Sequence, residues 1–158
     1  MKMIKKNQHS LDACDRRILT EIQRDLRRSP EEIAEAAGIS VSSYRRRLKR
    51  LRESGIIERE VALVNTGRMG IEVIVMVSLY EERGAEYDRL KRAYRASPQV
   101  TQCYSVTGDA DLILHVQMPD MASFEKWIEA NIIEDPAVKR CTSHVVYSRV
   151  KFDTSVML

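Results

Sequence analysis

Apolar residues recur at every third or fourth position in the first third of the chain, which is the spacing of amphipathic helices. The first run of this kind consists of Ile18, Leu19, Ile22 and Leu26. Asp12 can cap the helix that this run predicts, and Asp15 lies three residues further on. A second helix is predicted to begin after Ser29, where Ser-Pro-Glu-Glu forms a capping box with proline at the first helical position. It should end at Gly38, which suits the left-handed turn after a helix.

The third predicted helix, residues 40–52, has an apolar stripe on one side and a basic face on the other. At about 100° per residue, the stripe consists of Val41, Tyr44, Leu48 and Leu51. Six of the nine residues from Tyr44 to Arg52 are arginine or lysine, and none is acidic. A helix that is merely solvated usually mixes charges of both signs. The single-sign face therefore favours a helix that enters the major groove of DNA, with a basic surface helix as the alternative.

Only Gly38 and Ile39 separate the second helix from Ser40, which can cap the third. Two short helices joined by a tight glycine turn, the second of them basic, are typical of a helix-turn-helix. Together with the first helix they predict a three-helix unit over residues 11–54. A short strand or wing is expected at residues 56–61.

The apolar pattern of the second half predicts strands and helices in alternation. Strands are expected at residues 71–79, 100–106, 111–118 and 138–152, and helices at residues 84–97 and between Pro119 and Pro136. This β-α-β-β-α-β order is that of a ferredoxin-like domain, in which two helices pack on one face of a four-stranded antiparallel sheet. The predicted fold class is therefore α+β, with an N-terminal winged helix-turn-helix and a C-terminal ferredoxin-like domain. A second copy of the chain would most simply cover the open sheet face.

The charge of the chain changes sign between its two halves. Residues 1–65 contain 15 Lys/Arg and 10 Asp/Glu, a net charge of +5, whereas residues 66–158 contain 11 and 13, a net charge of −2. Binding of a polyanion is therefore assigned to the first half. The predicted domains are a disordered arm at residues 1–10, a DNA-binding domain at 11–60, a linker at 61–70, and an effector-binding and oligomerisation domain at 71–158.

Several classes of protein are excluded by what the sequence lacks. No apolar run approaches 18 residues, so no membrane span is predicted, and the N-terminus lacks the apolar core of a signal peptide. Three widely spaced cysteines indicate reduced thiols in the cytoplasm rather than disulfides. We expect no metal, because Cys103, His115, Cys141 and His144 match no compact zinc motif. No cofactor is expected either, because the chain has no phosphate-binding loop or dinucleotide fingerprint.

Motifs along most of the chain resemble those of the Lrp/AsnC, or feast/famine, family of bacterial and archaeal transcription regulators. These motifs are L-D-x-x-D-R-R-I-L from Leu11, S-G-I-I after the basic helix, V-x-L-V-N at residues 61–65, V-T-G-D-A-D-L at 106–112 and M-P-D-M at 118–121. The resemblance implies a helix-turn-helix domain followed by a ferredoxin-like domain that forms dimers, often assembled into octamers. It also implies binding of a small effector, typically an amino acid.

The start of the basic helix departs from the family pattern. The family often has S-P-x-x-C there, whereas this chain has Ser-Val-Ser-Ser-Tyr, so DNA contacts are predicted from helical phase instead. Six residues are predicted to contact DNA: Ser42, Ser43, Arg46, Arg47, Lys49 and Arg50. The two serines lie at the N-terminal end of the helix, which would enter the groove, and are candidates for contacts to base edges or phosphate. Arg46 and Arg50 are placed to read guanine through O6 and N7. Arg47 and Lys49 flank them and are assigned to phosphate.

The turn Gly-Asp-Ala-Asp at residues 108–111 is the second candidate site. From the residues alone, its two acids could bind an ammonium group, a metal or nothing, and a turn in which Asp111 bonds the backbone is the simplest interpretation. The family resemblance implies instead an effector pocket between subunits. By position, its lining residues would be Ser105, Gly108, Asp109, Asp111, Met121, Thr142 and His144. Asp111 would accept from the ammonium group of an amino acid, and N–H groups near Gly108 would donate to its carboxylate.

The sequence therefore predicts a non-enzymatic, homo-oligomeric regulator of transcription that binds double-stranded DNA and is located in the cytoplasm, at the nucleoid. Two alternatives stay open. An enzyme resembling the tetrapyrrole decarboxylases of related fold would need histidine or arginine around a large pocket, and its first domain need not be basic. An interaction partner of another regulator would carry acids within the basic face of the third helix.

Overall fold

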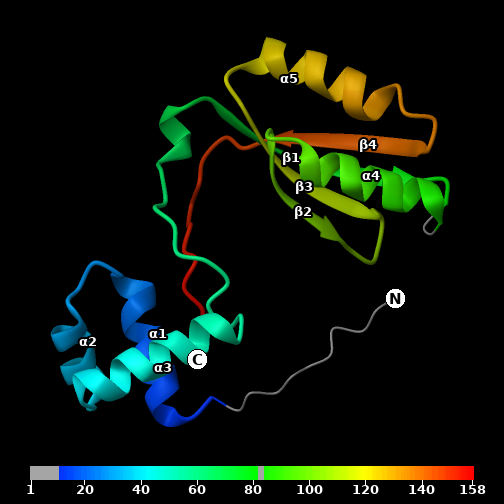
Figure 1. Ribbon diagram of the computed structural model, residues 1–158. Helices are drawn as coiled ribbons and strands as arrows, with labels where there is room; N and C mark the ends of the chain where they lie inside the picture. Colours follow the sequence, from blue (N-terminus) through cyan, green and yellow to red (C-terminus); the bar gives the residue numbers. More distant parts are fainter. Residues whose placement is uncertain (1–10, 82–83) are drawn as a thin grey trace. The chain divides into compact units, whose positions relative to one another are not determined.

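The computed structural model describes residues 11–81 and 84–158 (Figure 1). The chain divides into two compact units, one comprising the chain up to Ala62 together with Lys151–Leu158, and the other comprising Leu63–Val150. The predicted arm at residues 1–10 lies outside the described residues.

The last eight residues, predicted as the end of the second domain, group with the helical unit instead. The side chain of Gln23 binds the backbone of Val156 twice. The Val156 N–H donates to Gln23 Oε1 at 2.8 Å, and Gln23 Nε2 donates to the Val156 carbonyl at 3.2 Å.

The helical unit contains α1 (Ala13–Arg24), α2 (Pro30–Ala37) and α3 (Val41–Glu53). The predicted starts are confirmed, because Asp12 and Ser29 form capping boxes and the Ser40 side chain accepts from the Ser43 N–H. Gly38 closes α2 with φ 67°, the left-handed conformation that glycine adopts without a steric penalty. The buried core of the unit is formed by Ile18, Leu19, Ile22, Ile33, Ala34, Ala37, Tyr44, Leu48 and Leu51.

Two details of this unit differ from the sequence prediction. Leu26 is 40% exposed, because α1 ends at Arg24 and Asp25 leaves the helix in an extended conformation. The predicted strand or wing at residues 56–61 is not a strand, since this segment of the described chain pairs with no other. Ile57 packs against the helical core instead, and its N–H donates to the Leu51 carbonyl at 3.1 Å.

The second unit has the predicted β-α-β-β-α-β order. A short 3-10 turn, η1 (Thr66–Arg68), leads into the elements β1 (Ile71–Leu79), α4 (Ala85–Ala96), β2 (Val100–Ser105), β3 (Leu112–Met118), α5 (Met121–Ile128) with its π-helical extension η2 (Glu129–Ile133), and β4 (Val138–Val145). The sheet is antiparallel with the strand order β2-β3-β1-β4. The α+β fold class is thereby confirmed.

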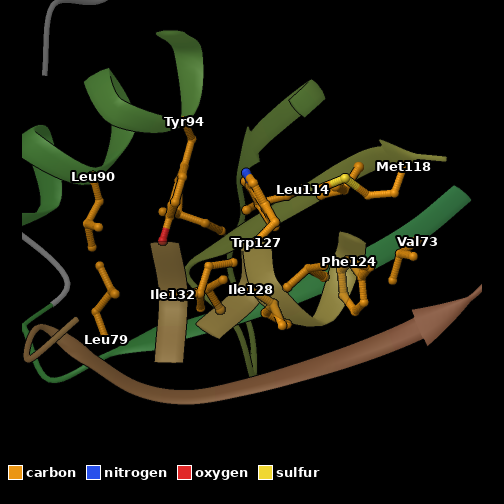
Figure 2. Close-up of a cluster of buried hydrophobic side chains, with 14 residues drawn as sticks. Val73, Leu79, Leu90, Tyr94, Leu114, Met118, Phe124, Trp127, Ile128 and Ile132 are labelled. Atoms are coloured by element: carbon orange, nitrogen blue, oxygen red, sulfur yellow. The ribbon is translucent and has the colours of Figure 1, made fainter. Parts of the chain in front are cut away.

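Burial alternates along β1 and β3, as it does in strands with one covered face. Inward-facing valines and leucines of these strands form one core with Leu90 and Tyr94 of α4 and with Phe124, Trp127 and Ile128 of α5 (Figure 2). Both helices therefore cover the same face of the sheet.

The last strand is shorter than predicted, ending at Val145 rather than at residue 152. Val145 lies opposite Val73, and the Val146 N–H donates to the Glu72 carbonyl at 2.8 Å. In this register the first residue of β1, Ile71, is level with Tyr147, so residues after Tyr147 have no neighbouring strand to continue the ladder.

Arg89 of α4 holds the loop before β4 through Asp135. Its Nη2 donates to both carboxylate oxygens, at 2.7 and 2.8 Å, and the Ala137 N–H donates to Oδ1 at 3.0 Å. The Asp135 side chain is only 14% exposed. Its pKa is lowered, chiefly by the hydrogen bonds from Arg89.

We expect Asp135→Asn to lower the free energy of unfolding of this unit by about 1–2 kcal/mol at pH 7, because a charged hydrogen bond is lost. Because the pKa of Asp135 is lower in the folded state than in the unfolded state, its ionised carboxylate stabilises the fold above the usual aspartate pKa of about 4. This stabilisation is lost as the pH falls below that value and the carboxylate is protonated. The difference in Tm between wild type and variant should therefore shrink in acid. Glu86→Gln is the matched control, since Glu86 binds the same arginine but its side chain is 58% exposed. A difference independent of pH would contradict this role for the ion pair.

Candidate nucleic-acid interface and ligand pocket

The apolar stripe of α3 faces the core of its unit, which leaves the opposite side of the helix to solvent. Tyr44, Leu48 and Leu51 are buried, as the sequence predicted. Four of the predicted DNA-contact residues are exposed: Ser42, Arg46, Lys49 and Arg50. Ser43 is half-buried, with its N–H on the capping Ser40.

Acidic side chains pair with five of the six basic residues of α3. The pairs are Arg45–Glu31 at 3.7 Å, Arg47–Asp12 at 2.5 Å, Lys49–Glu53 at 3.8 Å, Arg50–Asp15 at 2.6 Å and Arg52–Glu60 at 2.7 Å. Over the described part of the chain, Arg46 makes no ion pair and no hydrogen bond through its side chain, and it is exposed. The uniformly basic face of the sequence is thus partly neutralised once the helices pack.

Asp15 joins α1 to α3 from inside the unit, with a side chain that is only 2% exposed. Arg47 Nη1 donates to its Oδ1 at 2.9 Å, and Arg50 Nη2 donates to Oδ1 and Oδ2 at 2.7 and 2.6 Å. Arg47 is 20% exposed, whereas Arg50 is 54% exposed. Arg47, predicted as a phosphate contact, therefore lies mostly inside the unit, and only Arg50 of this pair extends to solvent.

The electrostatics of the Asp12–Arg47 pair follow from these contacts. The backbone N–H of Asp15 and the guanidinium of Arg47 lower the pKa of Asp12 to about 2. Hydrogen bonds to Asp12 and then to Asp15 raise the pKa of Arg47. Both partners are therefore charged at neutral pH, and their ion pair links the start of α1 to the middle of α3.

A hollow of about 460 Å³ lies at the end of the sheet where strand β1 ends and strand β3 begins. Its lining residues are Ser78, Leu79, Gly108, Asp109, Asp111, Lys139 and Arg140. Three of the seven predicted effector residues, Gly108, Asp109 and Asp111, are thus brought together. Lys139 and Arg140 were missed, because only the register of β4 on β1, which sets Arg140 opposite Ser78, brings them to the hollow.

The turn at this hollow is fixed to the end of β1 on both sides. The Asp111 N–H donates to the Val77 carbonyl at 2.9 Å, and Asp111 Oδ2 accepts from the Leu79 N–H at 2.8 Å. Ser78 Oγ donates to the Asp109 carbonyl at 2.8 Å, and Arg140 Nη2 approaches the same oxygen at 3.4 Å. One oxygen of Asp111 is therefore used by the fold, whereas Oδ1 makes no hydrogen bond within the described part of the chain.

The other four predicted effector residues do not line this hollow. Ser105 lines a second one of about 260 Å³, beside Lys91 and Arg95 of α4. Met121 begins α5, beyond the far end of β3, and a strand of seven residues spans roughly 20 Å. Thr142 and His144 lie on β4 opposite Met76 and Ile74. Within one chain the predicted set does not form a single pocket.

Two of the cysteines lie on strands that do not pair with each other. Cys103 lies on β2 and Cys141 on β4, at opposite edges of the sheet. Over residues 11–81 and 84–158, no group of three or more histidine, cysteine, aspartate or glutamate side chains could hold a metal ion. None of the helices in these ranges is long and apolar enough to cross a membrane.

Two family descriptions match the chain, one on each unit. Residues 11–58 match "Winged helix-turn-helix DNA-binding", and residues 72–156 match "Lrp/AsnC ligand binding domain". The chain is 40% identical to the uncharacterized HTH-type transcriptional regulator y4tD of Sinorhizobium fredii, over 89% of this chain and 85% of the relative. It is 31% identical to the leucine-responsive regulatory protein of Escherichia coli, over 89% of this chain and 87% of the relative.

Solved structures of transcriptional regulators match more than nine-tenths of the chain. A crystal structure of an AsnC family transcriptional regulator from Agrobacterium tumefaciens has a TM-score of 0.83 at 26% identity, covering 92% of this chain and 95% of its own. The transcriptional regulator NMB0573 of Neisseria meningitidis, solved as a complex with L-Met, has a TM-score of 0.84 at 27% identity, covering 93% and 96%.

Proposed function

This chain belongs to the Lrp/AsnC family of DNA-binding transcriptional regulators. From this premise we propose which of its residues bind DNA and which bind an effector. The exposed side of α3 binds the major groove of double-stranded DNA. The hollow around Gly108, Asp109 and Asp111 binds a small effector, an amino acid, and its occupancy alters DNA binding. The observation that supports the effector site is that acidic and basic side chains line the same hollow.

Arg46 is proposed as the residue that reads a base. It is exposed, it lies on the first half of α3, and no acid of the described chain competes for its guanidinium. A free guanidinium can donate two parallel hydrogen bonds to guanine O6 and N7. Ser42 and Lys49, exposed on the same helix, are proposed to contact the DNA beside it.

The ligand hollow has the charges that an amino acid zwitterion needs. Asp111, with Asp109 beside it, supplies acceptors for an α-ammonium group, and Lys139 and Arg140 supply donors for an α-carboxylate. The side chains of β4 thereby take the role that the sequence assigned to backbone N–H groups near Gly108. The complex of the Neisseria regulator with L-Met supports an amino acid as the class of effector.

We also propose that two copies of the chain pair through the open face of the sheet. Ile74, Met76 and Ile113 lie on this face, opposite the buried positions of β1 and β3, and are only half-buried in the single chain. Apolar positions of this kind favour a second copy as cover. We further propose that these dimers assemble into larger oligomers, and that the protein is located in the cytoplasm, at the nucleoid.

The proposal is tested by titrating the purified chain onto genomic DNA fragments at moderate salt, with and without each standard amino acid. Discrete complexes that survive competitor DNA and change with one amino acid are expected. Complexes that no amino acid alters would leave DNA binding intact and contradict the assigned hollow. No specific binding to any fragment would contradict the role given to α3.

A further inference from the structure

We propose that Asp15 of α1 is a positioning residue for DNA binding, because it holds the guanidinium of Arg50 at the surface of α3 in one orientation. The proposal rests on the function above, since it requires that α3 contacts DNA. Asp15 does not touch DNA itself in this scheme. It sets how specifically the helix binds.

The first argument is the number of cations around a buried carboxylate. At 2% exposure, Asp15 must be paired and hydrogen-bonded to remain charged in the fold. Arg47 is mostly buried and is shared between Asp12 and Asp15, so it supplies one cation to two carboxylates. Arg50 is the second cation, and it balances the charge of the group. Of these two arginines, only Arg50 has more than half of its side chain in solvent, so its guanidinium is both held by Asp15 and open to DNA.

The second argument is the geometry of the guanidinium group. Both contacts of Arg50 to Asp15 come from Nη2. A guanidinium binds one partner bidentately through a pair of parallel N–H groups, either on Nε and Nη2 or on Nη1 and Nη2. Both of these pairs include Nη2. With Nη2 held by Asp15, one N–H group on Nε and two on Nη1 remain, and no two of these three are parallel. These suit one phosphate oxygen rather than the O6 and N7 pair of guanine.

A phosphate contact from a fixed group positions the helix on the duplex. Contacts to phosphate set register and orientation, whereas bases are read by other side chains. An Arg50 released from Asp15 can reach any phosphate nearby, which supports binding to every sequence equally. Asp15 should therefore raise the ratio of specific to non-specific affinity through Arg50, leaving base reading to Arg46.

The test compares Asp15→Asn, Arg50→Gln, the double variant and Asp25→Asn in the full chain. Asp25→Asn removes the same charge from the same unit, but its ion pair is to Arg27 and lies outside α3. Kd is measured on a duplex that the wild type selects from a randomised pool, and on a scrambled duplex of equal length, over a range of salt. We expect Asp15→Asn to lower the ratio of the two affinities by about tenfold, with scrambled DNA bound as tightly as before or tighter. Asp25→Asn should leave the ratio unchanged.

In the Arg50→Gln background, the effect of Asp15→Asn on the ratio should disappear, because both changes act through one contact. Equal weakening on both duplexes, in step with the unfolded fraction seen by circular dichroism, would make Asp15 merely structural and overturn the proposal. Arg50→Lys keeps the charge and leaves Asp15 paired with Arg47, so it tests the same point without loss of folding. It should lower the ratio too, and an unchanged ratio would overturn the proposal. A wild type that selects no sequence would contradict the proposed function itself.

Discussion

Replacing Arg46 with alanine is expected to weaken specific DNA binding by about ten- to one-hundredfold, which corresponds to the loss of one bidentate guanine contact of about 1–3 kcal/mol. The thermal unfolding of the protein should not change. Arg46 is exposed, and among the described residues its side chain binds nothing that its removal would leave unsatisfied. Surface substitutions of this kind alter stability by roughly 0.5 kcal/mol or less.

The measurement is Kd on the duplex selected by the wild type and on single-base variants of it, together with Tm. The variant should lose discrimination at one base-pair position, because that is what a base-reading residue contributes. Arg24→Ala is the matched control. It removes the same charge from the same unit, and its ion pair to Glu21 lies within α1. Weakened binding without loss of discrimination at any position would make Arg46 a phosphate contact, and a fall in Tm would make it structural.

Asp111→Asn is expected to abolish the response to the amino acid effector while DNA binding without effector stays normal. The asparagine keeps an oxygen for the Leu79 N–H, which Asp111 Oδ2 accepts at 2.8 Å, so the turn should stay in place. What it loses is the negative charge facing an ammonium group. Charge-assisted hydrogen bonds contribute about 1.5–3 kcal/mol, so effector affinity should fall by at least about tenfold.

Effector affinity is measured by calorimetry with the amino acid found in the titration on DNA, and the response is measured as the change in Kd for DNA. Asp88→Asn is the control, because Asp88 is an exposed acid of the same unit that pairs with Lys91 on α4 and does not line the hollow. If the response survives in Asp111→Asn, the ligand does not use this carboxylate. Asp111→Ala is the less informative change, since it also leaves the Leu79 N–H without its partner.

Local chemistry made much of the fold predictable from the sequence. The capping boxes at Asp12 and Ser29 and the left-handed turn at Gly38 depend on neighbours within four residues, so the helix boundaries they mark were predicted correctly. The run of valine and isoleucine at residues 71–79 likewise predicted a strand, which is β1. The errors arose where a distant partner decides the outcome. Residues 56–61 lack a neighbouring strand, and residues after Tyr147 lie beyond the start of β1.

The site shows the same division. The sequence determined that α3 is amphipathic, that six of its residues are basic, and that two acids lie in one turn at residues 108–111. It could not determine which cations are free, because Asp15 meets Arg50 across 35 positions of the chain and buries a charge only when α1 packs on α3. Nor could it place Arg140 beside Asp109, which depends on the pairing of the first and last strands. Charge is a property of the sequence, but its neutralisation depends on distance, and the tertiary structure alone sets that distance.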